Sequence, residues 1–410
     1  MPIEMKDSGI EWIGEIPSHW KLPKVKQLFQ IGRGRVIAVT ELTEEGLYPV
    51  FSSQTKNNGC LGYIDTYDFD RDQLTWTTDG ANAGTVFLRT GKHNCTNVCG
   101  TLLPYSNAHN LKYLKFALEY IAIYHKRADI NGYKIMNNEM ADIVITLPSK
   151  QEQDDIADFL DRRCTEIDAV IEQTKATIEE YKKLKQSVIT EAVTKGIRGD
   201  RPMKDSGNIW YGCIPSEWDI RKLKYVFTIK KDIAGKEGYT VLSITQKGVV
   251  PKNISSNEGQ LAENYSNYQL VAIGDFAMNH MDLLTGWVDI SQYEGVTSPD
   301  YRVFVLNDTI NNCKQYYLYL MQMCYSNRIF YGLGQGVSGM GRWRLQADKF
   351  LNFTIPIPPT QEQKEIANYL DQKCAEIDTL IEKKTALLAE METYKKSLIF
   401  EYVTGKKEIV

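Results

Sequence analysis

The sequence predicts an α+β fold. We expect two globular heads separated by two long helices, which form an antiparallel coiled coil with a pseudo-two-fold axis. Three observations lead to this prediction. Residues 151–194 recur as residues 361–404 at a constant shift of 210, and neither stretch contains proline or glycine. Residues 5–29 recur as 203–227 at a shift of 198, so the opening of each half is also repeated. The segments between these blocks resemble each other poorly, which indicates two heads with shared ends and different interiors.

The two long stretches have the hydrophobic spacing of a coiled coil. Apolar residues alternate three and four positions apart, which defines an a/d seam. The first copy ends where the second head begins, about 65 Å along at 1.5 Å per residue. The second copy must therefore run back along the first. The predicted seam residues are Cys164, Ile167, Ile171, Ile178 and Val188 in the first copy and Cys374, Ile377, Ile381, Leu388 and Leu398 in the second.

The repeats divide the chain into four parts. We expect the first head at residues 1–147, the first helix at 148–199, the second head at 200–357 and the second helix at 358–410. Short alternating segments such as Val86–Arg89 and Tyr301–Leu306 predict strands within the heads. Each head should also contain one amphipathic helix, at Leu111–Lys126 and Gln315–Phe330, and a closing strand, at Ile143–Leu147 and Phe353–Ile357.

Charge and composition limit the possible partners. The 410 residues carry a net charge of −4; residues 148–199 and 359–410 contribute −2 each, so the heads are neutral. Neutral heads would bind DNA only through local basic clusters or with partners that supply charge. No apolar run approaches the length of a membrane span, and the N-terminal sequence lacks a signal-peptide core. Eight cysteines, two of them on helix seams, fit a reducing compartment, and we expect a cytoplasmic protein.

The sequence contains no recognisable catalytic signature. It has no Gly-x-x-x-x-Gly-Lys-Ser/Thr motif and no Asn-Pro-Pro or Asp-Pro-Pro followed by an aromatic residue. The glycines at positions 332, 334 and 336 follow a predicted helix rather than a strand, so they indicate a loop. His93, Cys95 and Cys99 lack a second nearby Cys/His pair, which favours an ordinary loop over a zinc site. We therefore predict no catalytic residue, no metal and no cofactor in this chain.

Basic and amide side chains gather in loops at similar places in both heads. Lysine and arginine position phosphates, and Asn, Gln, Arg and Lys read base edges. For any single residue, a solvated face or a turn is the simpler explanation. The candidate DNA-binding residues are Lys24, Lys26, Arg33, Arg35, Ser53, Gln54, Lys56, Asn57, Asn58, Thr78, Asp79, Asn82, Tyr133 and Lys134 in the first head and Lys230, Lys231, Gln246, Lys247, Asn279, Met281, Gln335, Ser338, Arg342 and Arg344 in the second.

Two repeated phrases resemble a known family. Ile-Pro-x-x-Trp followed by a basic and hydrophobic run occurs as IPSHWKLPKVKQLF and IPSEWDIRKLKYVF. A Gln-Glu-Gln phrase occurs as PSKQEQDDIADFLD and PPTQEQKEIANYLD. Both resemble the target-recognition domains and spacer helices of type I restriction–modification specificity subunits. The resemblance covers the whole chain, but the divergent interiors do not allow base contacts to be carried over.

The resemblance implies a non-catalytic subunit. Each head would be a target-recognition domain reading one half of an asymmetric bipartite site on double-stranded DNA, and the coiled coil would set the spacer. Two methyltransferase subunits would bring S-adenosylmethionine, and restriction subunits using ATP and Mg would join in some complexes. Two other interpretations remain open: a coiled-coil adaptor that does not bind DNA, and a DNA nuclease or methyltransferase with an unrecognised site.

Overall fold

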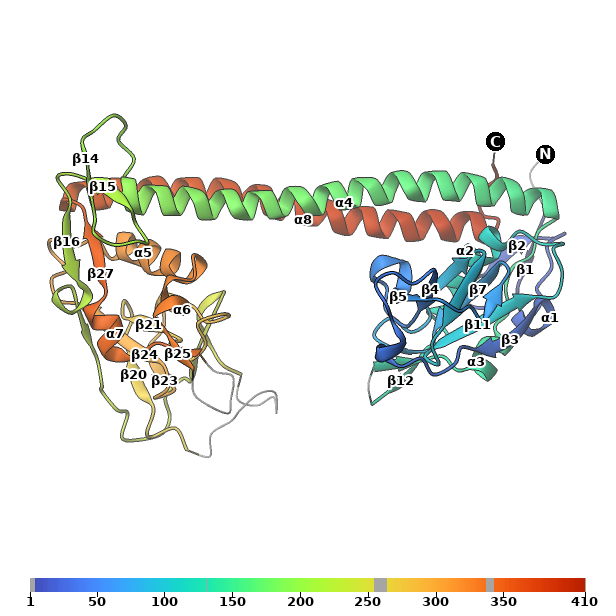
Figure 1. The fold of residues 1–410 in the computed structure, drawn as a ribbon, viewed down its shortest axis with the longest axis horizontal. Coiled ribbons are helices and arrows are strands. Elements are labelled where there is room, and N and C mark those ends of the chain that lie inside the picture. The colour runs from blue at the N-terminus through green and yellow to red at the C-terminus, as the bar shows by residue number, and fades with distance from the viewer. Residues whose placement is uncertain (1–3, 131, 254–263, 337–342, 410) are drawn as a thin grey trace. The chain divides into compact units, whose positions relative to one another are not determined.

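The structure is a computed structural model that describes residues 4–130, 132–253, 264–336 and 343–409. Two long helices dominate it (Figure 1): α4 spans Lys150–Lys195 and α8 spans Thr360–Val403. The chain divides into two compact units. Unit 1 comprises Met1–Lys175 and Thr385–Val410, and unit 2 comprises Ala176–Lys384. Each unit therefore contains one head and part of both helices.

The helices pair in opposite directions within each unit. In unit 1, Phe159 of α4 packs against Tyr402 of α8, and Asp168, further along α4, pairs with Lys395, which lies earlier in α8. In unit 2, Lys185 of α4 pairs with Asp378 of α8. The predicted antiparallel pairing of the two repeats is therefore confirmed. Helices α4 and α8 match the repeated stretches 151–194 and 361–404 to within one residue at each end, and both lie inside the wider ranges 148–199 and 358–410 expected for the helical parts.

The head of unit 1 contains several small sheets. Its central sheet has the order β3-β11-β7-β9 and is antiparallel. The strands of this sheet are β3 (Phe29–Arg33), β7 (Gln73–Thr77), β9 (Val86–Arg89) and β11 (Cys99–Pro104). The outer strands are β1 (Met5–Asp7) with β2 (Glu15–Pro17), β5 (Cys60–Ile64) with β4 (Tyr48–Phe51), β10 (Lys92–Cys95) and β6 (Phe69–Asp70), and β12 (Arg127–Asp129) with β13 (Gly132–Lys134) and β8 (Asp79–Gly80). Short helices are α1 (Val25–Leu28), η1 (Val39–Glu41), η2 (Lys56–Gly59), α2 (Leu111–Ala122) and α3 (Asn137–Asp142).

The head of unit 2 repeats the central sheet and the first two-stranded pair, but its other outer sheets differ. Its central sheet has the order β17-β24-β21-β22 and is again antiparallel. The strands of this sheet are β17 (Phe227–Ile229), β21 (Phe276–Met278), β22 (Val288–Ile290) and β24 (Arg302–Leu306). The outer pairs are β14 (Met203–Asp205) with β15 (Cys213–Pro215), β16 (Asp219–Lys222) with β27 (Thr354–Ile357), β18 (Leu242–Thr245) with β19 (Gly248–Pro251), β20 (Gln269–Val271) with β23 (Gly295–Thr297), and β25 (Gln335–Gly336) with β26 (Trp343–Arg344). Its short helices are η3 (Leu223–Tyr225), α5 (Lys314–Ser326), α6 (Ile329–Leu333) and α7 (Ala347–Asn352).

Three predicted elements differ from the structure. Helix α2 ends at Ala122 rather than Lys126, because the following residues turn and enter β12. The predicted helix Gln315–Phe330 breaks where Arg328 adopts a left-handed conformation with φ of 56°. Residues 143–147 form isolated bridges instead of a strand. Pro23 lies opposite them and has no N–H to complete the ladder, whereas Arg221 at the equivalent place lets β16 and β27 pair fully.

The core of each unit includes side chains from both long helices. In unit 1, Phe29, Trp76 and Ile145 of the head share a cluster with Leu160 of α4 and Val403 of α8. Unit 2 has a corresponding cluster in which head residues pack against both helices. The head and the helix pair therefore fold as one body within each unit. Among the described residues, no helix combines the length and apolar character needed to cross a bilayer.

Candidate nucleic-acid interface

Polar side chains of the first head gather on the loop between β4 and β5. Asn57 and Asn58 adopt left-handed conformations with φ of 50° and 51°, which asparagine tolerates better than most residues. The side chains of Lys56, Asn57 and Asn58 are exposed. Ser53 is half-buried, and Gln54 donates a hydrogen bond from Nε2 to the carbonyl of Cys60. The loop thus presents an ammonium and two amide groups to solvent.

A second group of candidates lies on the sheet β12-β13-β8. Backbone pairing places Lys134 opposite Asp79 and Tyr133 opposite Gly80. Tyr133 is exposed, and Lys134 forms an ion pair with Asp129 at 2.5 Å. Asn82, in the turn that follows β8, is also exposed.

Thr78 does not belong to this exposed group. Its side chain is buried, and its hydroxyl donates to the carbonyl of Val98 at 3.0 Å. In this structure its side chain is a structural contact and is not available to DNA.

The basic candidates near the start of the first head already have acidic partners. Asp142 accepts ion pairs from the Nζ atoms of Lys24 at 3.0 Å and Lys26 at 2.8 Å. Hydrogen bonds from Lys26 and Lys24 lower the pKa of Asp142. Arg35 pairs with Asp68 at 3.1 Å and Glu41 at 3.3 Å. Arg33 donates to the sulfur of Met136 at 3.4 Å, with no carboxylate partner among the described residues. Phosphate contact by the lysines and Arg35 would require exchange of these exposed pairs.

In the second head, candidates surround a hollow of about 630 Å³. Asn279 and Met281 line it, and the Asn279 Oδ1 atom accepts a hydrogen bond from the backbone N–H of Met281 at 3.2 Å. Gln246 and Lys247 form the turn of the β18–β19 hairpin, and Gln246 donates to the carbonyl of Thr285 at 3.5 Å. Since Thr285 also lines the hollow, the hairpin turn and the Asn279 loop lie together.

Two further candidate groups in the second head lie outside this hollow. Gln335 and Arg344 are paired across the β25–β26 ribbon, while Ser338 and Arg342 lie outside the described residues. Lys230 forms an ion pair with the nearly buried Asp275 at 2.6 Å, so it has a structural partner. The neighbouring Lys231 is exposed.

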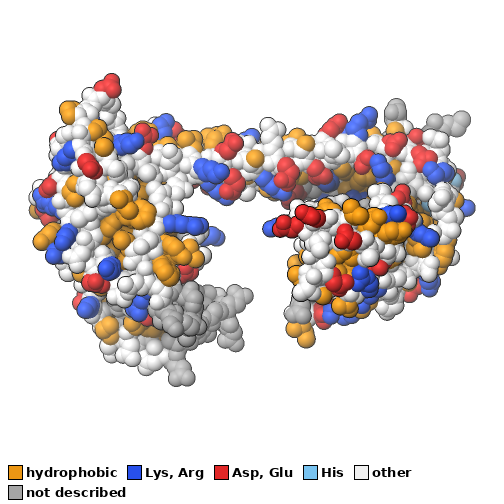
Figure 2. Space-filling view, viewed as in Figure 1, with side chains coloured by type: hydrophobic (Ala, Val, Ile, Leu, Met, Phe, Trp, Pro, Cys, Tyr) orange, Lys and Arg blue, Asp and Glu red, His pale blue; other side chains and the backbone are white. Residues whose placement is uncertain are grey.

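Most of the residues predicted to form the seam are buried. Cys164, Ile167, Ile171 and Ile178 of α4 and Cys374, Ile377 and Leu398 of α8 are buried, and Val188, Ile381 and Leu388 are half-buried. Burial raises the pKa of the Cys164 thiol to about 11. On the face drawn in Figure 2, both acidic and basic side chains lie along the long helices. The predicted seam positions are therefore mostly removed from solvent, and the face drawn in Figure 2 carries charges of both signs.

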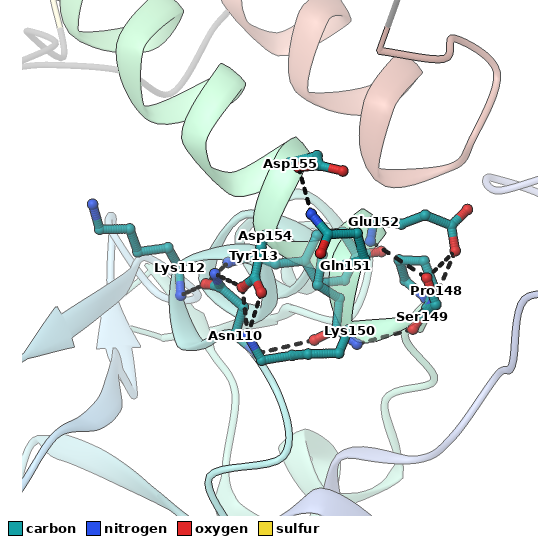
Figure 3. A network of polar contacts seen from close by, with 11 residues as sticks. Asn110, Lys112, Tyr113, Pro148, Ser149, Lys150, Gln151, Glu152, Asp154 and Asp155 are labelled. Atoms are coloured by element: carbon teal, nitrogen blue, oxygen red, sulfur yellow. Dashed lines mark hydrogen bonds and ion pairs between the residues drawn. The ribbon is translucent and has the colours of Figure 1, made fainter.

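A polar junction attaches each head to its helix, and the sequence did not identify its individual residues. In unit 1 the start of α4 is surrounded by the network in Figure 3. Gln153 is buried; its Oε1 atom accepts from the backbone N–H of Asn110 at 2.9 Å, and its Nε2 atom donates to the carbonyl of Pro148 at 2.9 Å. Glu152 accepts from Trp20 Nε1 at 3.1 Å. The repeated Gln-Glu-Gln phrase was the signal for this junction.

Two buried arginines were also missed. Arg89 ends β9 and Arg302 begins β24, and they are 1% and 4% exposed. Burial lowers the pKa of each guanidinium to about 10. Burial, together with the charges of Arg302 and Arg344, lowers the pKa of the neighbouring His280 to about 3. No sequence signal distinguishes these arginines from exposed ones.

Comparison with known proteins assigns the family. The family model described as "Type I restriction modification DNA specificity domain" matches residues 17–180 and again residues 215–390. The chain belongs to this family. The two matches cover both heads and most of both helices, as the repeat predicted. Because the family consists of DNA specificity domains, the prediction of a specificity component rather than an enzyme is confirmed.

Individual relatives are similar over part or all of this specificity chain. A "putative type I specificity subunit S.MpnORF289P N-terminus" of Mycoplasma pneumoniae is 40% identical over 34% of this chain and 76% of its own length. Further relatives from that organism are matched over 38% to 67% of their own length. The "Type I restriction enzyme MjaVIII specificity subunit" of Methanocaldococcus jannaschii is 25% identical over 95% of this chain and 93% of its own.

A solved structure shares the fold. It is described as "Structural basis underlying complex assembly and conformational transition of the type I R-M system". It matches with a TM-score of 0.67 at 13% identity, covering 96% of this chain and 99% of its own. At this identity the similarity concerns the fold alone.

Proposed function

We propose that this chain reads an asymmetric bipartite site on double-stranded DNA, one half with each head, and that it scaffolds two methyltransferase subunits. One observation carries the proposal: two copies of a DNA specificity domain lie in one chain and expose different polar groups. The first head exposes Lys56, Asn57 and Asn58 on its β4–β5 loop, whereas the second exposes Lys247 on a hairpin beside the Asn279 hollow. Unlike reading surfaces should select unlike half-sites.

Matching hollows beside the helix pair support two copies of one partner. In unit 1 a hollow of about 660 Å³ lies between α2 and the helices, and Asp168 and Lys395 line it. In unit 2 a hollow of about 510 Å³ lies between α5 and the helices, lined by Asp378 and Lys185. The four residues are related by the 210-residue repeat. Equivalent surfaces on a repeated chain suit two identical subunits.

The chemistry would come from the partners. The methyltransferase subunits would carry S-adenosylmethionine, and restriction subunits, where present, would use ATP and Mg. Within the described part of the chain, no three His, Cys, Asp or Glu side chains come together as a metal site. The heads are neutral overall, so we expect weak, salt-dependent DNA binding by the isolated chain and tighter binding within the complex. The complex would act in the cytoplasm.

Exchange of one head tests the proposal. The proposed recognition domains span residues 1–147 and 200–357, and the proposed spacer helices span 148–199 and 358–410. The exchange replaces residues 30–147 with the corresponding part of another head. The chain is expressed with its methyltransferase, and methylated positions in the genome are sequenced. The wild type should give a split, non-palindromic motif, and the exchange should change one half while the other half serves as the internal control. A single continuous palindrome would contradict the proposal.

A further inference from the structure

Arg89 is a buried cation that holds the polar loop of the first head. Its Nη1 atom donates to the carbonyl of Asn58 at 2.6 Å, and its Nε atom donates to the hydroxyl of Thr75 at 3.0 Å. The guanidinium lies over the rings of Phe51 at 3.7 Å and Phe87 at 4.3 Å. Among the described residues its Nη2 atom has no hydrogen-bond partner.

Arg302 is a second buried arginine, in the second head, and it contacts one backbone carbonyl and one aromatic ring. Its Nη2 atom donates to the carbonyl of Leu345 at 3.0 Å, and its guanidinium lies 4.8 Å from the centre of the Phe350 ring. Its Nη1 atom is buried without a hydrogen-bond partner in the described part of the chain. Leu345 follows Arg344 of the β25–β26 ribbon, and its N–H donates to the carbonyl of His280 at 2.9 Å. The carbonyl of Leu345 therefore accepts from the buried Arg302, and its N–H donates to the backbone of the buried His280.

These arginines are costly to bury. Within the described ranges neither forms an ion pair with a carboxylate, and a buried charge without a partner costs several kcal/mol. Both remain charged at neutral pH, since burial lowers each pKa only to about 10. A hydrophobic side chain of similar length would fill either place at lower cost. Retention of the charge therefore points to a role beyond packing.

The two buried arginines do not occupy equivalent positions of the internal repeat. Arg89 lies on the edge strand β9, whereas Arg302 lies on β24 in the middle of its sheet. Each head therefore places its buried arginine on a different strand. What they share is the acceptor: each arginine binds a backbone carbonyl within or directly after a candidate reading segment. The Asn58 carbonyl belongs to a loop whose left-handed residues require such support.

We propose that Arg89 and Arg302 are positioning residues, each of which sets base recognition by its own head. This proposal rests on the proposed function. Arg89 fixes the Asn57–Asn58 loop for the first half-site, and Arg302 fixes the end of the β25–β26 ribbon for the second. The planar guanidinium of Arg89 bridges two acceptors, and that of Arg302 binds one carbonyl while it packs on the Phe350 ring, so lysine should replace either one incompletely.

The test uses the full chain in complex with its methyltransferase. The variants are Arg89→Met, Arg89→Lys, Arg302→Met and Arg302→Lys, and the readout is the methylated motif. The Arg89→Met variant should lower discrimination against single-base changes at least tenfold in one half-site and leave the other unchanged, because small displacements of a contact group have effects of this size. The Arg302→Met variant should act on the opposite half. The lysine variants should restore part of the discrimination.

Two controls separate positioning from stability. Leu102→Ala and Leu306→Ala remove buried side chains from the same two sheets, at positions away from the candidate reading segments, so they should lower methylation evenly and leave the motif intact. Should Arg89→Met not fold, Gly59→Ala disturbs the same contact from the loop side, because its Cβ would lie 2.7 Å from Arg89 Nη2.

The outcomes are distinguishable. Arginine variants that behave like the two alanine controls, or that relax both halves equally, would overturn the positioning role. A wild-type chain that gives no split motif would instead overturn the proposed function.

Discussion

The two units share most hydrogen bonds of the junction between head and helix, while their outer sheets differ except for the first two-stranded pair. The repeated contacts join Trp20 to Glu152 and Trp218 to Glu362, Asn110 to Gln153 and Cys313 to Gln363, Gln153 to Pro148 and Gln363 to Pro358, and Tyr113 to Val403 and Tyr316 to Val193. The central sheets also share their strand order. Most of the contacts that fix a head to the helices are therefore the same in both units, and the surface beyond the central sheet is free to change its base preference.

The largest difference within this shared junction is the burial of its glutamate. Glu362 is buried and pairs with Arg201 at 2.6 Å, whereas Glu152 is partly exposed beside His19. Glu362→Ala should therefore destabilise unit 2 by about 3 kcal/mol, because it removes the buried partner of Arg201 and the acceptor of Trp218, while Glu217 at 3.0 Å still pairs with Arg201. Glu152→Ala should cost unit 1 about 1–2 kcal/mol. Urea unfolding followed by hydrogen exchange assigns each loss to its unit. Equal losses of unfolding free energy in the two variants would show that burial of the glutamate does not make the unit 2 junction more stable than the unit 1 junction.

The two units also differ in one aromatic contact between the long helices, which unit 1 has and unit 2 lacks. In unit 1 the ring of Tyr402 packs 4.5 Å from that of Phe159. At the equivalent positions unit 2 has Ala192 and Tyr369, which line a hollow of about 970 Å³. Tyr402→Ala should cost about 3 kcal/mol. Ala192→Tyr should change stability by less than about 1.5 kcal/mol because space is available. Thermal unfolding measures both, Tyr402→Phe is the control that keeps the ring, and similar costs for the two exchanges would refute the contrast.

The partly exposed glutamate should also make unit 1 sensitive to acid. Burial raises the pKa of Glu152, but hydrogen bonds from Ser149, His19 and Trp20 outweigh it and bring the pKa to about 2. The folded pKa is below the unfolded value of about 4.3, so the stabilisation is complete above that pH and is lost as pH falls towards 2. With solvent screening we expect about 1 kcal/mol. Between pH 2 and 5 the urea midpoint should depend less steeply on pH for Glu152→Gln than for the wild type. Identical pH dependence of the two midpoints would contradict this.

The smallest effect concerns the repeated ion pairs of the helices. Lys395 pairs with Asp168 and Lys185 with Asp378, both at 2.6 Å and both partly exposed. Each should contribute about 0–1 kcal/mol and weaken in salt. Double-mutant cycles at low and high salt measure the two coupling energies, which should agree within about 0.5 kcal/mol. A coupling above about 2 kcal/mol in one unit would show that the repeated pairs are not energetically equivalent.

The long helices could be predicted because their signal is long and occurs twice. A period sustained over forty residues outweighs any local preference, so the helices differ from the repeated stretches 151–194 and 361–404 by one residue at each end. The outer strands gave no such signal. The strands β6, β8 and β25 have two residues each, and their pairing depends on partners distant in sequence.

The candidate site could be predicted only as a set of polar loops. Thr78 and Asp79 look equivalent in sequence, yet the Val98 carbonyl binds one hydroxyl and buries it. Arg89 ends a correctly predicted strand, but its burial depends on two phenylalanine rings and on a carbonyl 31 residues away. Contacts of this kind are set by tertiary packing, which local sequence does not encode.

Unit 1 is discontinuous in sequence, and this has a consequence for biosynthesis. The hydroxyl of Thr146 donates to the carbonyl of Val403 at 2.6 Å, so the head is completed by residues near the chain's end. Roughly 200 residues of unit 2 are translated in between, which takes about 10–40 s at synthesis rates of 5–20 residues per second. Throughout that interval the nascent first head has an unfilled apolar face. Ribosome-bound chains should therefore recruit chaperones until the final helix emerges.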